Sequence, residues 1–125
     1  MFLSPPDRET LAVLRERVHL IDAPTALNWY RAGQALMIDV REPFEYGQAH
    51  IPEAKLVPLS SFEPDHIPTP PEAGRLVLHC AVGVRCGYAA MALVRVGHPG
   101  PLYRVEGGFK AWQAHGGPVE RGSWC

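Results

Sequence analysis

The sequence predicts an α/β fold, with an open, mainly parallel twisted sheet of about five strands and helices on both faces. Two short apolar runs, at 35–40 and 75–79, are bounded by polar residues, as expected of buried parallel strands. Segments whose apolar residues recur at helical spacing separate these runs along the chain. Such alternation of strands and helices is typical of a parallel sheet covered on both sides.

The first elements are predicted from capping residues and apolar spacing. Ser4 is expected to cap an opening helix with Pro5 in its first turn. A short strand follows at 19–21, and Asp22 is expected to cap a second helix that Gly33 ends.

The remaining elements continue the alternation as far as the C-terminal region. Four prolines without apolar periodicity mark 63–74 as a surface loop. The expected elements are a strand at 35–40, a helix at 43–48, strands at 55–58 and 75–79, a helix at 86–96, a strand at 102–105 and a helix from about Gly108 to His115.

Length and composition indicate one globular domain. The chain has 125 residues, 46% hydrophobic and 20% charged, with a formal net charge of −1 and no basic stripe, which argues against nucleic acid as a partner. We expect a helical extension at 1–18, the domain at 19–121 and a tail at 122–125. No membrane partner is expected, because no apolar stretch approaches roughly 18 residues.

The start of the chain lacks the basic and apolar regions of a signal peptide, and three cysteines cannot all pair within one chain. We therefore expect free thiols in a reducing cytoplasm. Thirteen prolines, a single asparagine and ten arginines against two lysines fit a thermophilic source, although GC-rich codon usage gives a similar bias.

The strongest chemical signal is Cys80, which closes an apolar run just before a glycine-bearing loop and a helix. Backbone N–H groups of such a loop, together with the helix dipole, favour a negative charge at this position. A thiol there is expected to have a lowered pKa and to react as the thiolate. The predicted site is Cys80 with the loop residues Ala81, Val82, Gly83, Val84, Arg85 and Cys86.

A second polar strand end lies at Asp39, and parallel strands bring such ends to one edge of the sheet. Asp39 is expected to accept backbone N–H bonds and to hold adjacent loops. Arg41 and Glu45, four residues apart, are expected either to pair on a helix surface or, for Arg41, to touch substrate. The six histidines show no metal-ligand spacing, so neither a metal nor a cofactor is predicted.

Three separated motifs carry a family resemblance. They are Ile38-Asp39-Val40-Arg41-Glu42-Pro43-Phe44-Glu45-Tyr46 with His50-Ile51-Pro52-Glu53-Ala54, the loop Cys80-Ala81-Val82-Gly83-Val84-Arg85, and Val105-Glu106-Gly107-Gly108-Phe109-Lys110-Ala111-Trp112 with Gly117-Pro118. Together they resemble the rhodanese-like family of sulfurtransferases in its single-domain form. Glu53 stands where the family usually has glycine, residues 48–49 add one position before His50, and Cys86 replaces a small polar residue.

The resemblance implies that Cys80 takes the outer sulfur of thiosulfate or a similar donor, carries it as a persulfide, and passes it to a thiophilic acceptor. The implied partners are a small sulfur-donor anion and a thiol or sulfur-carrier acceptor; the oligomeric state stays open. Two alternatives are a rhodanese-fold binding or redox-regulatory module and a phosphatase or arsenate reductase. The second is disfavoured because Arg85 follows Cys80 by five positions, one fewer than an oxyanion cradle of that kind has.

Two residues of the loop each have two predicted roles. Arg85 either orients an anionic donor by bidentate contact or pairs with a carboxylate and holds the loop. Cys86 either fills the start of a helix as a small residue or acts as a resolving thiol toward Cys80. His79 is expected to point to the opposite face of the strand from Cys80, and Cys125 is expected to be incidental.

Overall fold

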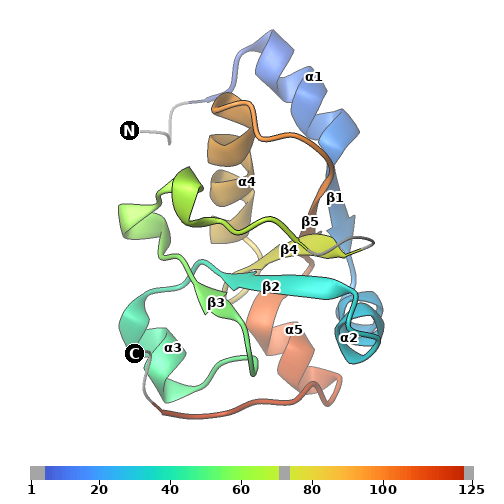
Figure 1. Cartoon of the computed structure of the whole chain (residues 1–125), viewed down its shortest axis with the longest axis vertical. Helices are drawn as coiled ribbons and strands as arrows, with labels where there is room; N and C mark the ends of the chain where they lie inside the picture. The colour runs from blue at the N-terminus through green and yellow to red at the C-terminus, as the bar shows by residue number, and fades with distance from the viewer. Residues whose placement is uncertain (1–4, 71–73, 123–125) are drawn as a thin grey trace.

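The computed structural model describes residues 5–70 and 74–122. Five parallel strands form one sheet in the order β1-β5-β4-β2-β3 (Figure 1). The elements are α1 (Arg8–Arg17), β1 (Val18–Ile21), α2 (Ala23–Arg31), β2 (Ala35–Asp39), α3 (Pro43–Gln48), β3 (Lys55–Leu56), the 3₁₀ turns η1 (Leu59–Ser61) and η2 (Pro64–His66), β4 (Arg75–His79), α4 (Arg85–Arg95), β5 (Leu102–Val105) and α5 (Gly108–Ala114).

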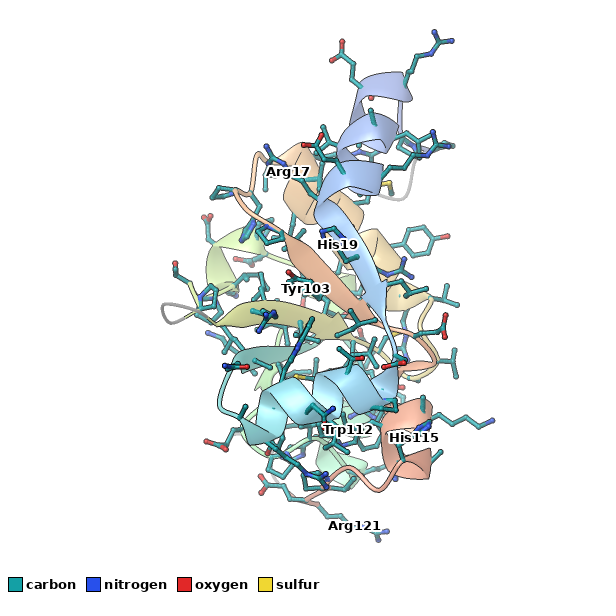
Figure 2. The ribbon with its side chains drawn as sticks, turned by 90° about the vertical axis from the view of Figure 1, so that its right-hand side faces the viewer. Arg17, His19, Tyr103, Trp112, His115 and Arg121 are labelled. Carbon is teal, nitrogen blue, oxygen red and sulfur yellow. The ribbon has the colours of Figure 1, made fainter. Side chains whose placement is uncertain are left out.

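Helices cover both faces of the sheet, as the strand and helix alternation predicts. In Figure 1, α1 and α4 lie above the sheet, and α2 and α5 lie below it. Successive strand residues point to opposite faces, so β4 contributes side chains to two separate hydrophobic cores. Leu76 and Leu78 pack toward α4, whereas Val77 packs toward α2 and α5. The core beneath the sheet contains Trp112 of α5, which is labelled in Figure 2.

The helix starts follow local capping chemistry, with one correction at the first helix. Asp22 caps α2 by accepting the Thr25 amide at 2.8 Å, as expected. The opening helix, however, begins at Arg8, and its cap is Asp7, whose carboxylate accepts the Thr10 amide at 2.7 Å. Pro5 therefore precedes the helix, and Ser4 lies outside the described residues.

The loop after α3 needs an unusual backbone conformation at Glu53. This residue has φ +69°, in the left-handed region that side chains other than glycine seldom adopt. The family that the three motifs resemble usually has glycine at this position, so Glu53 adopts a backbone conformation that suits glycine. No helix in residues 5–70 and 74–122 is long and apolar enough to cross a membrane.

The sheet register brings the two polar strand ends together. β2 and β4 are neighbours and run parallel, with Asp39 opposite His79. The residues that follow, Val40 and Cys80, therefore leave the sheet at the same edge, and the Val40 amide donates to the His79 carbonyl at 3.0 Å. β1 is the edge strand next to β5. Its His19 lies against Tyr103 of β5, with the ring centroids 5.4 Å apart (Figure 2).

Candidate active site

Cys80 lies immediately after β4, at the floor of the loop that leads into α4. The Gly83 amide donates to its Sγ at 3.1 Å, so the loop curls back over the sulfur. The residue is 1% exposed, whereas Val82 and Val84 in the loop above it are 57% and 60% exposed. The sulfur thus faces the loop amides and is almost fully covered.

The surroundings of this sulfur stabilise a negative charge. Hydrogen bonding from the Cys86 thiol, with further donation from the backbone amides of Cys86, Gly83 and Val82, lowers the pKa of Cys80 to about 5, and burial opposes the shift. The backbone amides of Val82, Gly83 and Cys86 therefore all act on the sulfur, as expected of the loop. At neutral pH the group is a thiolate, the nucleophilic form.

The loop keeps its shape because glycines let other backbone segments approach closely. Gly83 has φ +99°, and a Cβ there would lie 3.2 Å from the Gly107 nitrogen. A Cβ on Gly108 would overlap the Cys80 carbonyl. This closeness allows amides at the start of α5 to bind loop carbonyls, as Phe109 does to Cys80 at 2.8 Å. The turn at residues 106–107 and the start of α5 at Gly108 therefore lie against the Cys80 loop.

Arg85 pairs with a carboxylate, which is one of its two predicted roles. Its Nη1 and Nη2 donate to the two carboxylate oxygens of Glu45 at 2.7 and 2.9 Å. The Arg85 hydrogen bond lowers the pKa of Glu45 to about 2, so this carboxylate stays ionised at neutral pH. The expected pairing of Arg41 with Glu45 is wrong, because Arg85 occupies Glu45 across 40 positions of sequence.

Arg41 is buried, against the expectation of a helix-surface residue. Its guanidinium donates to the Asp39 carboxylate at 2.8 Å and to the Ala49 carbonyl at 2.7 Å, and it lies 4.3 Å from the centre of the Phe109 ring. Asp39 also accepts the Arg41 amide at 2.9 Å, in agreement with its predicted backbone contacts. Asp39 and Arg41 are 0% and 4% exposed, so their role here is to hold the loop after β2.

Cys86 lies in the first turn of α4 and is fully buried beside Cys80. Its hydrogen bond to the Cys80 sulfur, burial and the nearby negative charge all raise the pKa of the Cys86 thiol. Cys86 is therefore protonated and serves as a donor to the thiolate. A resolving role would require Cys86 to lose the proton that it shares with Cys80.

Arg104 is a site residue that the sequence analysis missed. It lies on β5, and its Nη2 donates to the Gly83 carbonyl at 2.8 Å. Its side chain also contacts the Cys86 thiol and lies against Gly87, where an added Cβ would be 3.1 Å from Nη2. The only sequence signal is a charged residue in an apolar strand pattern, which does not reveal its partner.

His79 points away from the nucleophile, as predicted from strand alternation. Its ring lies 6.3 Å from that of Phe109, which belongs to the core under α2 and α5, whereas Cys80 belongs to the core under α4. Complete burial lowers the pKa of His79, so the ring is neutral at neutral pH. It is not placed to act as a base for Cys80.

An apolar groove of about 560 Å³ borders the loop on its α4 side. Pro5 and Pro6 from the N-terminal segment, Val84 from the loop, and Tyr88 and Met91 from α4 are among its lining residues. The loop thus lies between α3, which supplies Glu45, and a mostly apolar surface on α4.

The geometry defines a parallel α/β domain with a cysteine cradled by backbone amides at the carboxyl edge of its sheet. The model of the rhodanese-like domain matches residues 22–115, and this chain therefore belongs to the rhodanese-like family. Several of its relatives bear sulfurtransferase names.

Three similar proteins illustrate the range of the family. The uncharacterized protein slr1261 of Synechocystis is 37% identical over 98 residues, which cover 78% of this chain and 54% of that protein. The thiosulfate:glutathione sulfurtransferase of Saccharomyces cerevisiae is 35% identical over 66% of this chain and 67% of its own length. A rhodanese-like domain protein of Staphylococcus aureus has a TM-score of 0.67 at 28% identity, covering 84% of this chain and 99% of that one. The chain thus spans about half of slr1261.

Proposed function

We propose that this protein is a sulfurtransferase that moves sulfane sulfur from thiosulfate or a similar donor to a thiophilic acceptor through a persulfide on Cys80. The observation that carries the proposal is the convergence of the Gly83 amide and the Cys86 donors on one sulfur with a pKa of about 5. A persulfide anion needs the same donors as a thiolate, so one cradle serves both states of the cycle.

The reaction has two displacement steps. In the first, the Cys80 thiolate attacks the outer sulfur of thiosulfate; the donor S–S bond breaks, and sulfite leaves with the bonding electron pair. In the second, a nucleophilic acceptor attacks the terminal sulfur of the persulfide and restores the thiolate. Such covalent catalysis predicts ping-pong kinetics. The acceptor is a thiol or a sulfur-carrier protein, and a reducing compartment such as the cytoplasm keeps the thiolate available.

Intact-mass spectrometry tests the persulfide. Incubation with thiosulfate, followed by removal of the donor, is expected to add one sulfur, about 32 Da, to the protein. Cys80→Ser is expected to abolish the addition, and Cys125→Ser, in the C-terminal residues outside the described ranges, is expected to keep it. Iodoacetamide labelling at Cys80 serves as the control for access, because the residue is 1% exposed. A labelled thiol that accepts no sulfur from any sulfane donor would refute the proposed function.

A further inference from the structure

The two arginines that the sequence offers for binding an anionic donor are both occupied. Arg85 uses two nitrogens on the carboxylate of Glu45, and Arg41 is divided between Asp39 and the Ala49 carbonyl. A guanidinium that makes a bidentate contact with one carboxylate has little capacity left for a second anion. Neither arginine is free to receive the sulfonate end of thiosulfate.

The rim of the loop is apolar instead. Val82 and Val84 are 57% and 60% exposed, and Phe44 is 64% exposed at the start of α3, next to the Glu45 that binds the loop. Tyr88, one helical turn into α4, is 39% exposed and continues this surface into the groove. These four residues are half of the eight large apolar side chains exposed in the described ranges, so exposed apolar surface is concentrated on the Cys80 loop and on α3 and α4, the helices next to it.

Charge and solvation then separate two kinds of donor. Thiosulfate is a compact dianion, and it must lose water to approach a thiolate near which Arg85 and Arg41 are already paired with carboxylates and Arg104 donates to the Gly83 carbonyl. A donor with an apolar body and one negative charge loses less hydration and gains burial against the rim. The same Cys80 chemistry is available to both.

We propose that the Cys80 site selects organic sulfane donors, with Val82, Val84 and Phe44 contacting the apolar body, over the inorganic dianion thiosulfate. This inference rests on the proposed function, because it requires Cys80 to accept sulfane sulfur. With an organic thiosulfonate, the Cys80 thiolate attacks the outer sulfur, the donor S–S bond breaks, and a sulfinate leaves with the electron pair. Two negative charges enter the step and two leave it, on the persulfide and on the sulfinate.

Three donors separate charge from apolar contact: thiosulfate, methanethiosulfonate and benzenethiosulfonate. The rate of persulfide formation on Cys80 is followed by intact mass for each donor and divided by the rate of the same donor with free N-acetylcysteine thiolate, which removes intrinsic reactivity. The normalised rate is expected to be at least about tenfold higher for benzenethiosulfonate than for methanethiosulfonate. Thiosulfate is expected to be the slowest of the three. Equal normalised rates, or a preference for thiosulfate, would overturn the proposal.

Variants locate the preference on the rim. The double variant Val82→Ser/Val84→Ser is expected to bring the ratio of benzenethiosulfonate to methanethiosulfonate close to one. The matched control Val96→Ser changes a valine that is 63% exposed at the other end of α4, and it is expected to keep the ratio. A double variant that keeps the full ratio would overturn the assignment.

Lys110 provides a further control, because its amide donates to the Ala81 carbonyl and its side chain is exposed. The order of donors is expected to survive Lys110→Ala. A selective loss of thiosulfate loading in this variant would show that a lysine recognises the donor, and it would overturn the apolar assignment. Failure of every donor to load Cys80 refutes the proposed function itself, whereas equal loading by all three refutes only the donor class.

Discussion

The loops that follow β2 and β4 leave the sheet side by side, and they direct their hydrogen-bond donors to different targets. After β4, the amides of Val82, Gly83 and Cys86 converge on the sulfur of Cys80. After β2, the amide and guanidinium of Arg41 converge on the carboxylate of Asp39. In both loops donors surround one anion. The second anion is held by a buried arginine within the chain, so that loop is a structural support.

The ion pairs at the two loops also differ in how far their side chains are exposed to solvent. The Asp39 and Arg41 side chains are 0% and 5% exposed, whereas Arg85 and Glu45, which join the Cys80 loop to α3, are 32% and 19% exposed. A buried charge that loses its partner is far costlier than a partly solvated one. The two pairs are therefore expected to respond very differently to the same kind of substitution.

The largest effect is expected from breaking the buried pair. Arg41→Ala leaves the Asp39 carboxylate buried without its counterion, so the free energy of unfolding is expected to fall by about 3–5 kcal/mol. Urea denaturation measures this loss, with Arg31→Ala, an exposed arginine at the end of α2, as the control. A loss no greater in Arg41→Ala than in the control would contradict the structural role assigned to the loop after β2.

The second effect concerns the charge that the Cys80 loop stabilises. Removing the Cys86 donor in Cys86→Ala is expected to raise the pKa of Cys80 by about one to two units, because a hydrogen bond to a charged group contributes ~1.5–3 kcal/mol. Cys86→Ser keeps a donor and is expected to stay near the original value of about 5. The pH dependence of iodoacetamide labelling measures both values.

This measurement also tests the role assigned to the Cys86 thiol. A Cys80 pKa in Cys86→Ala that equals the Cys80 pKa of the unchanged protein would mean that the backbone amides alone stabilise the thiolate. A Cys80 pKa that rises equally in the alanine and serine variants would point to a change in packing. Only a shift specific to alanine supports donation by the thiol.

The smallest effect is expected at the partly exposed pair. Glu45→Gln is expected to lower the free energy of unfolding by ~1 kcal/mol at neutral pH. Binding to Arg85 depresses the pKa of Glu45 from its ordinary value of 4.5 to about 2, so its contribution is present above pH 4.5 and is lost as the pH falls toward 2. Urea denaturation of both proteins across this range is expected to show the difference disappear. A difference that persists at pH 2 would mean that the charge of Glu45 is not its source.

Elements with strong local signals agree with the sequence prediction almost to the residue. α3 covers Pro43–Gln48 as expected, because Pro43 suits the first turn and Glu42 and Glu45 form a reciprocal cap. α1 was misplaced at its start because Ser4 and Asp7 are both good caps, and the sequence does not say which one the chain uses.

Long-range partners were not predictable in the same way. Spacing paired Arg41 with Glu45, because a helix brings positions four apart together. In the fold, Arg41 pairs with Asp39 instead, and Glu45 pairs with Arg85 of the loop after β4. Arg104 carried no signal at all, since its contact with Gly83 depends on β5 lying next to β4.

The sequence by itself determined the alternation of strands and helices, the edge at which reactive groups gather, and the cysteine that the loop surrounds. These features follow from apolar periodicity and from backbone preferences of neighbouring residues. Only the tertiary structure decided which carboxylate neutralises each arginine, which amides reach the sulfur, and which apolar side chains remain exposed around it. Those outcomes depend on distances between segments far apart in the chain, because ion pairing, desolvation and burial are set by what lies nearby in space.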